Sequence, residues 1–89
     1  MKTLLRTTQF KKDLKRMQKR GKDFSVLRKL LESLQNNIPL EPKFRDHALI
    51  GNYQGTRECH IEPDWLLLYE SSESEIVLIR TGTHSDLFQ

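Results

Sequence analysis

The stretch Ile76-Val-Leu-Ile-Arg-Thr-Gly-Thr-His-Ser-Asp-Leu-Phe88 decides how this chain folds. It opens with four aliphatic residues, most of them β-branched, which is typical of a strand covered on both faces. The run continues into a guanidinium at Arg80 and an imidazole at His84. We therefore expect a buried strand that presents ionisable side chains where it leaves the sheet.

A second strand is predicted over residues 56–61, where polar and apolar residues alternate. Side chains of a strand point alternately to its two faces, so Cys59 and Ile61 share one face. The opposite face carries Glu58, His60 and Glu62. We therefore expect His60 to point away from the apolar side of its own strand.

Two turns connect this strand to the strands that follow. Residues 62–64, Glu-Pro-Asp, predict a tight turn, so the apolar run 65–70 returns antiparallel to the preceding strand. A second polar turn at 71–74 leads into the strand 75–81. The second half of the chain therefore predicts a three-stranded meander.

The first half predicts a short strand at residues 2–6 and two helices. Thr7 or Thr8 can cap the first helix, and Gly21 ends it. Its core stripe is Phe10, Leu14 and Met17. Asp23 can cap the second helix, whose apolar face is Val26, Leu27, Leu30, Leu31 and Leu34. Because about three residues join the helices, we expect antiparallel neighbours, a helical hairpin.

The predicted fold is a small α+β domain spanning residues 1–89, in the order β-α-α-β-β-β. The helical hairpin packs on one face of an antiparallel-type sheet. Between the helices and the meander, residues 38–42 are extended because they contain two prolines, and residues 43–51 form a loop rich in ionisable groups.

Length and composition restrict the class of protein. A chain of 89 residues supports one modest core, and its apolar runs are far shorter than the roughly 20 residues of a membrane span. The amino terminus lacks the apolar segment of a signal peptide. The single Cys59 cannot form an internal disulfide and fits a small buried hydrophobe better than a nucleophile. We expect a soluble, cytoplasmic protein with no membrane partner.

The net charge of +3 conceals a strong asymmetry between the two halves. Residues 1–45 carry thirteen Lys or Arg and four Asp or Glu, whereas residues 46–89 carry two and eight. Within residues 11–22, seven cations stand against one acid. A solvated helix face is the simple explanation, but such a density favours a polyanion or an acidic protein as partner.

Histidine and arginine provide the groups that RNA cleavage without a metal requires. A base must take the 2′-hydroxyl proton, an acid must protonate the departing 5′-oxygen, and cations must stabilise the charged phosphorane. Imidazole suits both proton transfers because its ordinary pKa is about 6.5, and the arginine fork suits phosphate. The second half of the chain contains His47, His60, His84 and Arg80, and Phe88 can stack on a base.

Each candidate also has a structural explanation. His47 can be a surface residue, and His60 can be a cross-strand partner of Glu or Tyr. Asp64 follows a proline in a turn, where it can cap the backbone. Trp65 and Tyr69 fit the core better than a base-stacking platform, because they lie in an apolar run. A zinc site from Cys59, His60 and His84 is only weakly supported, because adjacent strand residues point to opposite faces.

Three segments resemble the YafQ branch of the RelE/ParE superfamily of bacterial toxins. They are Lys43-Phe-Arg-Asp-His-Ala-Leu49, then Gly55-Thr-Arg-Glu-Cys-His-Ile-Glu-Pro-Asp-Trp-Leu-Leu-Leu-Tyr69, then Arg80-Thr-Gly-Thr-His-Ser-Asp-Leu-Phe88. The resemblance spans nearly the whole chain and shows no departure at the motif positions. Toxins of this βααβββ type bind in the ribosomal decoding site and cut messenger RNA there.

The resemblance implies a role for each matching residue. His47, His60, Asp64 and His84 would form the proton-transfer group, Arg80 the phosphate clamp and Phe88 a base-stacking or positioning residue. Further substrate contacts are expected from Lys43, Arg45 and Arg57. The cations expected to hold ribosomal RNA are Lys11, Lys12, Lys15, Arg16, Lys19 and Arg20. No cofactor is implied.

The expected function is therefore a ribosome-dependent endoribonuclease, an mRNA interferase toxin neutralised by a cognate antitoxin. Two alternatives remain open on the sequence. One is a non-catalytic inhibitor like the gyrase-poisoning ParE branch, with a protein or DNA partner. The other is a plain RNA-binding domain, which would normally carry a paired aromatic platform. Three histidines with Arg80 favour the enzyme.

Overall fold

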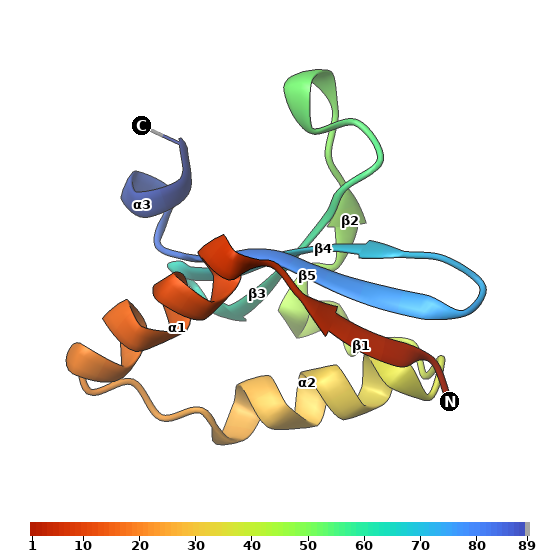
Figure 1. The fold of residues 1–89 in the computed structure, drawn as a ribbon, viewed down its shortest axis with the longest axis horizontal. Coiled ribbons are helices and arrows are strands. Elements are labelled where there is room, and N and C mark those ends of the chain that lie inside the picture. Colours follow the sequence, from red (N-terminus) through yellow and green to blue (C-terminus); the bar gives the residue numbers. More distant parts are fainter. Residues whose placement is uncertain (89) are drawn as a thin grey trace.

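Five strands form one mixed sheet, in the order β1-β5-β4-β3-β2 (Figure 1). The computed structural model describes residues 1–88, so Gln89, the last residue of the predicted domain, lies outside the described residues. The strands are β1 (Thr3–Arg6), β2 (His47–Ala48), β3 (Arg57–Glu62), β4 (Trp65–Ser71) and β5 (Glu75–Gly82). The helices are α1 (Thr8–Lys19), α2 (Ser25–Gln35) and α3 (His84–Phe88), with one-turn 3₁₀ helices η1 (Pro42–Phe44) and η2 (Gly51–Tyr53).

The predicted meander is confirmed, because β3 pairs antiparallel with β4 and β4 pairs antiparallel with β5. The sheet is mixed rather than wholly antiparallel, because β1 runs parallel to β5. Short turns force neighbouring strands to be antiparallel, but no short turn joins β1 to β5. The prediction of a loop over residues 43–51 is wrong at β2, which pairs with Glu58 and Arg57 at the sheet edge.

Both predicted helices are present, and Thr7 caps α1 as predicted, but the N-cap of α2 is Phe24 and not the predicted Asp23, whose carboxylate lies one residue before the cap. The Thr7 hydroxyl accepts a hydrogen bond from the Phe10 N–H at 2.9 Å, and the Asp23 carboxylate accepts one from the Ser25 N–H at 2.9 Å. The two helices lie on the same side of the sheet (Figure 1). They diverge from the loop that connects them, so they do not pack against each other along their whole length. Each helix packs its apolar stripe on the sheet, α1 against β5 and α2 against β3 and β5, but Val26 of the predicted α2 stripe is exposed.

The central strand β4 is buried on both faces. Trp65, Leu67 and Tyr69 pack with the apolar stripes of α1 and α2 in the main core. Leu66 and Leu68 point the other way and pack with Leu87 of α3 in a smaller second core. The sheet therefore has one face covered by α1 and α2 and a second face only partly covered by α3, which the sequence did not predict.

The short helix α3 is held at its start by a reciprocal cap. The Thr83 N–H donates to Asp86 Oδ2 at 2.9 Å, and the Asp86 N–H donates to Thr83 Oγ1 at 3.1 Å. A Cβ atom at Gly82 would lie only 2.9 Å from the Asp86 Cβ atom, so this position requires glycine. Arg20 of α1 binds the same carboxylate with both Nη atoms, at 2.7 and 3.0 Å.

A second carboxylate fastens α1 to β5. Asp13 is fully buried, and its oxygens accept hydrogen bonds from Arg80, Arg16, Gln9 and the Thr81 N–H. Burial on its own would raise the pKa of Asp13, but the hydrogen bonds from Arg80, Gln9 and Thr81 outweigh it and lower the pKa. The pKa of Asp86 is also lowered, chiefly by its bond from Arg20.

Within residues 1–88, every helix is too short or too polar to cross a bilayer.

These carboxylates make the stability of the fold sensitive to acid. The native pKa values of Asp13 and Asp86 lie below the ordinary value, so the unfolded chain binds more protons as the pH falls. Their contribution is fully present above pH about 4 and is lost below it. We expect urea denaturation to show that the free energy of unfolding falls from pH 5 to pH 2. In Asp86→Asn this fall should be smaller than in the unaltered protein by roughly 2 kcal/mol.

The matched control is Glu73→Gln, which removes an exposed carboxylate from the β4–β5 turn. It should leave the pH dependence as in the unaltered protein. An Asp86→Asn variant with the full wild-type acid sensitivity would contradict this assignment.

Candidate active site

His84 and Asp64 form a hydrogen-bonded pair at the end of β5. Asp64 lies in the turn between β3 and β4, and its Oδ1 accepts from the His84 backbone N–H at 3.0 Å and from Nδ1 at 2.6 Å. These two bonds, the backbone bond most of all, lower the pKa of Asp64. The imidazole therefore keeps its Nδ1 proton toward the carboxylate and presents Nε2. The ring is accessible, with 55% of the side chain exposed.

His60 lies in the middle of the site and is largely buried. Its Nε2 lies 2.9 Å from Glu58 Oε1, and its Nδ1 lies 3.3 Å from the Pro63 carbonyl oxygen. Only 10% of the His60 side chain and 8% of the Glu58 side chain are exposed. Both ring nitrogens therefore face acceptor oxygens, and the ring is fixed within the sheet face.

His47 flanks His60 on the side away from His84. Its Nδ1 lies 2.6 Å from the Arg45 carbonyl oxygen, which can only accept, so Nδ1 is the donor. Its Nε2 lies 4.0 Å from Glu58 Oε1, and half of the side chain is exposed. Arg45 adopts the left-handed conformation, with φ of 50°, at the end of η1, which brings its carbonyl to this position.

Five aromatic rings form a continuous row across the second face of the sheet. The ring centroids of His47 and His60 are 6.4 Å apart, and those of His60 and His84 are 5.9 Å apart. The row continues from His84 to Phe88 at 6.3 Å and from Phe88 to Tyr53 at 5.5 Å. The structure thus brings together all three histidines, Asp64 and Phe88.

Arg80 belongs to the same face as His60. In the sheet, Glu58 pairs with Leu68, and Leu68 pairs with Arg80, so these three side chains form a row on one face. The guanidinium binds Asp13 with Nε at 2.8 Å and Nη2 at 3.2 Å. The bond to Asp13 raises the pKa of Arg80 further above its ordinary value, so the group is a permanent cation.

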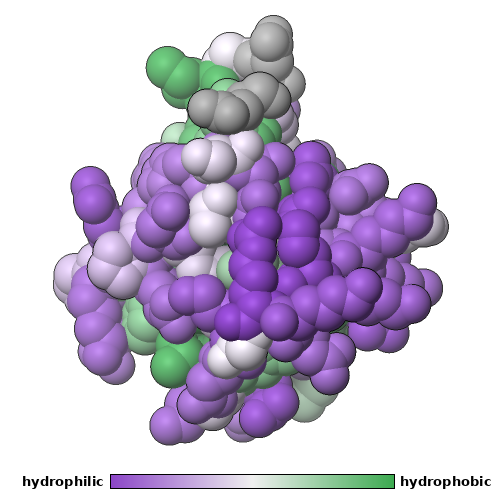
Figure 2. Space-filling view, turned by 90° about the vertical axis from the view of Figure 1, so that its left-hand side faces the viewer, coloured by the Kyte–Doolittle hydropathy of each residue, from purple (hydrophilic) through white to green (hydrophobic). Residues whose placement is uncertain are grey.

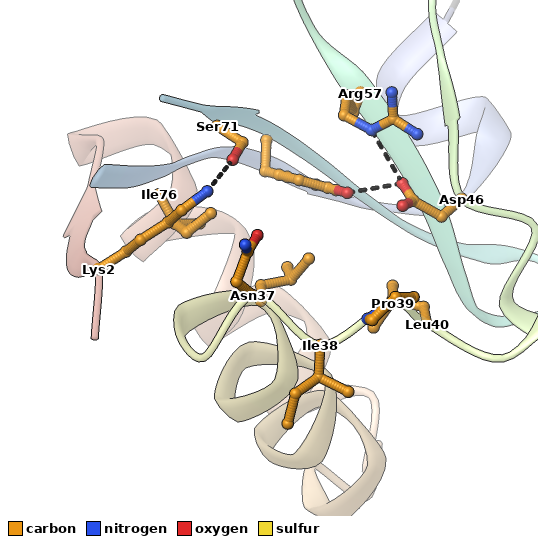
Figure 3. Close-up of a pocket in the computed structure, with 11 residues that line it drawn as sticks. Lys2, Asn37, Ile38, Pro39, Leu40, Asp46, Arg57, Ser71 and Ile76 are labelled. Atoms are coloured by element: carbon orange, nitrogen blue, oxygen red, sulfur yellow. Dashed lines mark hydrogen bonds and ion pairs between the residues drawn. The ribbon is translucent and has the colours of Figure 1, made fainter. Parts of the chain in front are cut away.

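Lys43, Arg45 and Arg57 occupy two different places. Lys43 and Arg45 line a hollow of about 340 Å³ together with His60. Arg57 points to the opposite face, where its Nε lies 3.3 Å from Asp46 Oδ1 and the Tyr69 hydroxyl donates to the same oxygen at 2.6 Å (Figure 3). Of the three cations expected to contact substrate, Arg57 therefore lies away from the histidines.

The cations of α1 also divide into two groups. Arg16 and Arg20 are engaged by Asp13 and Asp86, as described above. Four exposed lysines have no ion-pair partner within residues 1–88, namely Lys11, Lys12, Lys15 and Lys19. The side of the molecule that carries α1 has a mostly hydrophilic surface (Figure 2). The lysines are therefore the helix cations that remain available for a polyanion.

Cys59 does not join His60 in a metal site. It is fully buried in the main core, on the face opposite to His60, and burial raises the pKa of its thiol to about 12. Among the residues that the structure describes, no three His, Cys, Asp or Glu side chains are arranged to hold a metal ion.

The sequence did not predict the part that three residues play in this site. Glu58 holds His60 from two positions earlier on the same strand face, Tyr53 packs on Phe88, and Asp13 holds Arg80. The i, i+2 spacing of Glu58 and His60 was a usable signal. For Asp13, the only signal was a single acid among seven cations.

Comparisons with known proteins identify the family of the chain. The family model described as bacterial toxin of type II toxin-antitoxin system, YafQ, matches residues 2–89. The mRNA interferase toxin YafQ of Escherichia coli (strain K12) is 44% identical over 81 residues, which cover 90% of this chain and 88% of that protein. The chain is thus a homologue of an mRNA interferase.

Solved structures extend the likeness to three dimensions. The crystal structure of YafQ from E. coli strain BL21(DE3) superposes with a TM-score of 0.94 at 39% identity, covering both chains completely. A crystal structure of the E. coli DinJ-YafQ complex superposes with a TM-score of 0.92 at 40% identity, again covering both chains completely. The chain belongs to the YafQ family of toxins of type II toxin-antitoxin systems, within the RelE/ParE superfamily.

Proposed function

We propose that this chain is an endoribonuclease toxin that cleaves translated messenger RNA in the ribosomal A site, in the cytoplasm. The observation that carries the proposal is the pair of exposed imidazoles, His47 and His84, on either side of buried His60. Each exposed ring has its Nδ1 bound to an acceptor, which leaves Nε2 for proton transfer. The relationship to mRNA interferases supports the same chemistry.

The cleavage proceeds by attack of the 2′-hydroxyl on the adjacent phosphorus. One exposed imidazole takes the 2′-hydroxyl proton, the 2′-oxygen bonds to phosphorus, and the bond to the 5′-oxygen breaks. The other imidazole protonates the departing oxygen. Arg80 stabilises the negative charge that develops on the phosphorane. His60 is the buried ring between the two exposed imidazoles. Phe88, against Tyr53, supplies an aromatic surface for a base.

The ribosome is the proposed source of substrate alignment. The site is an open row of side chains on a sheet face, so an external partner must hold the messenger in the in-line geometry. The four exposed lysines of α1 are the proposed contacts to ribosomal RNA, whereas Arg16 and Arg20 are ion-paired with Asp13 and Asp86. A cognate antitoxin, corresponding to DinJ in the E. coli complex, is the proposed neutralising partner.

The decisive experiment is cleavage of a defined messenger RNA by the purified protein with and without ribosomes. We expect cuts in phase with codons only when ribosomes translate the messenger, and a loss of roughly 10²–10⁴-fold in His84→Ala and in His47→Ala. The control is Ser85→Ala, an exposed neighbour of His84 that should cleave normally. No cleavage by the unaltered protein under either condition would favour the non-catalytic, ParE-like inhibitor.

Asp64→Asn tests whether the carboxylate acts through His84. The amide oxygen can still accept from Nδ1 but carries no negative charge to stabilise the imidazolium, so we expect a cleavage loss of up to about 10⁴-fold, no larger than that of His84→Ala. Because the pair is exposed, the thermal midpoint should change little. The substitution should add nothing in a His84→Ala background, and an undiminished additional loss there would show that Asp64 acts elsewhere.

The lysine face of α1 is tested by the salt dependence of ribosome binding. Lys11 and Lys15 lie one turn apart, and we expect Lys11→Ala with Lys15→Ala to reduce the slope of log affinity against log salt by about 2. The control pair, Arg28→Ala with Lys29→Ala, removes the same charge from α2. Equal effects of the two pairs would mean that net charge, and not this face, binds the ribosome.

A further inference from the structure

Asp13 is the most heavily hydrogen-bonded side chain in the described part of the chain. Its Oδ1 accepts from Arg16 Nη2 at 2.8 Å, Gln9 Nε2 at 3.1 Å and Arg80 Nη2 at 3.2 Å. Its Oδ2 accepts from Arg80 Nε at 2.8 Å and the Thr81 N–H at 3.2 Å. None of the Asp13 surface is exposed to solvent.

The contact between Asp13 and Arg80 fixes both the position and the orientation of the guanidinium. The carboxylate takes the side of the fork formed by Nε and Nη2, and two parallel bonds hold the planar group against rotation. Nη1 has no protein partner within residues 1–88, and 28% of the side chain is exposed. The free edge of the fork is therefore presented outward, on the strand that leads to His84.

The local charge balance shows that Asp13 does not neutralise the positive charge around Arg80. The carboxylate is shared by two guanidinium groups, those of Arg80 and Arg16, so the cluster keeps a net positive charge. A group that only neutralised Arg80 would leave no cation for a phosphate. The arrangement combines a retained charge with a fixed geometry, which is what a preorganised phosphate donor requires.

We propose that Asp13 is a positioning residue for RNA cleavage, which holds the Arg80 fork so that its Nη1 edge receives the scissile phosphate. The proposal rests on the endoribonuclease function proposed above. Asp13 lies on α1, the same helix as the four exposed lysines proposed to bind ribosomal RNA. Contact of these lysines with RNA then fixes the helix backbone that carries Asp13 and, through it, the position of Arg80.

The test is single-turnover cleavage on programmed ribosomes. Asp13→Asn keeps the side-chain size but replaces one acceptor oxygen with an amide donor that opposes the arginine. We expect a rate loss of roughly 10- to 100-fold, as for other residues that orient a functional group from behind, with the half-saturating ribosome concentration little changed. Gln9→Ala is the control, because it removes another bond to the same carboxylate without touching Arg80.

An Arg80→Lys background separates positioning from general stability. Lysine keeps the charge but has no fork for Asp13 to orient, so Asp13→Asn should cause a much smaller additional loss there. The same factor in both backgrounds would overturn the proposal. An inactive unaltered protein would refute the endoribonuclease function itself, whereas an active protein with a fully active Asp13→Asn variant would refute only the role of Asp13.

The unaltered protein provides a test that does not depend on how the variants fold. In nuclear magnetic resonance spectra, the Arg80 Nε–H should exchange slowly with solvent, and its guanidinium protons should be resolved because rotation is restricted. A freely rotating and rapidly exchanging Arg80 group would overturn the proposal.

Discussion

The fold depends on how the chain provides hydrogen-bond partners for the backbone groups of β5 that lie beyond the end of β1. The pairing of β1 stops at Arg6, opposite Leu78, and leaves the rest of the β5 edge without a strand. The start of α1 takes over, because Thr7 bonds to the carbonyl oxygens of Leu78 and Ile79, and Asp13 accepts from the Thr81 N–H. Leaving such buried groups unpaired costs about 1–3 kcal/mol each. This requirement fixes α1 against β5 and thereby places Arg80.

The two faces of the sheet have different tasks. One face is covered by α1 and α2 and holds nearly all of the large apolar side chains. The other face carries the row of histidines and is covered in part, where α3 and Leu49 pack around Leu66 and Leu68. Because α3 is joined to α1 through Asp86 and Arg20, His84 is supported without a layer of protein above it. Stability and access are therefore obtained on opposite sides of β4.

Local patterns predicted the elements, but not the contacts between distant ones. Alternation in β3 placed His60 and Cys59 on opposite faces, the apolar stripes located α1 and α2, and a threonine cap marked the start of α1. The parallel partner of β1 and the short strand β2 were missed, because strand pairing across many residues leaves no local signature. For the same reason, the ion pairs of Arg16 with Asp13 and of Arg20 with Asp86 were not predicted.

The buried thiol of Cys59 can report how often the helices separate from the sheet. The thiol is the only one in the sequence, and it lies in the main core with a pKa raised to about 12. A thiol reagent needs both access and the thiolate, so it can react only when the helices leave the sheet. The rate of alkylation at this one atom therefore measures how often the two layers separate, and it does so without any substitution.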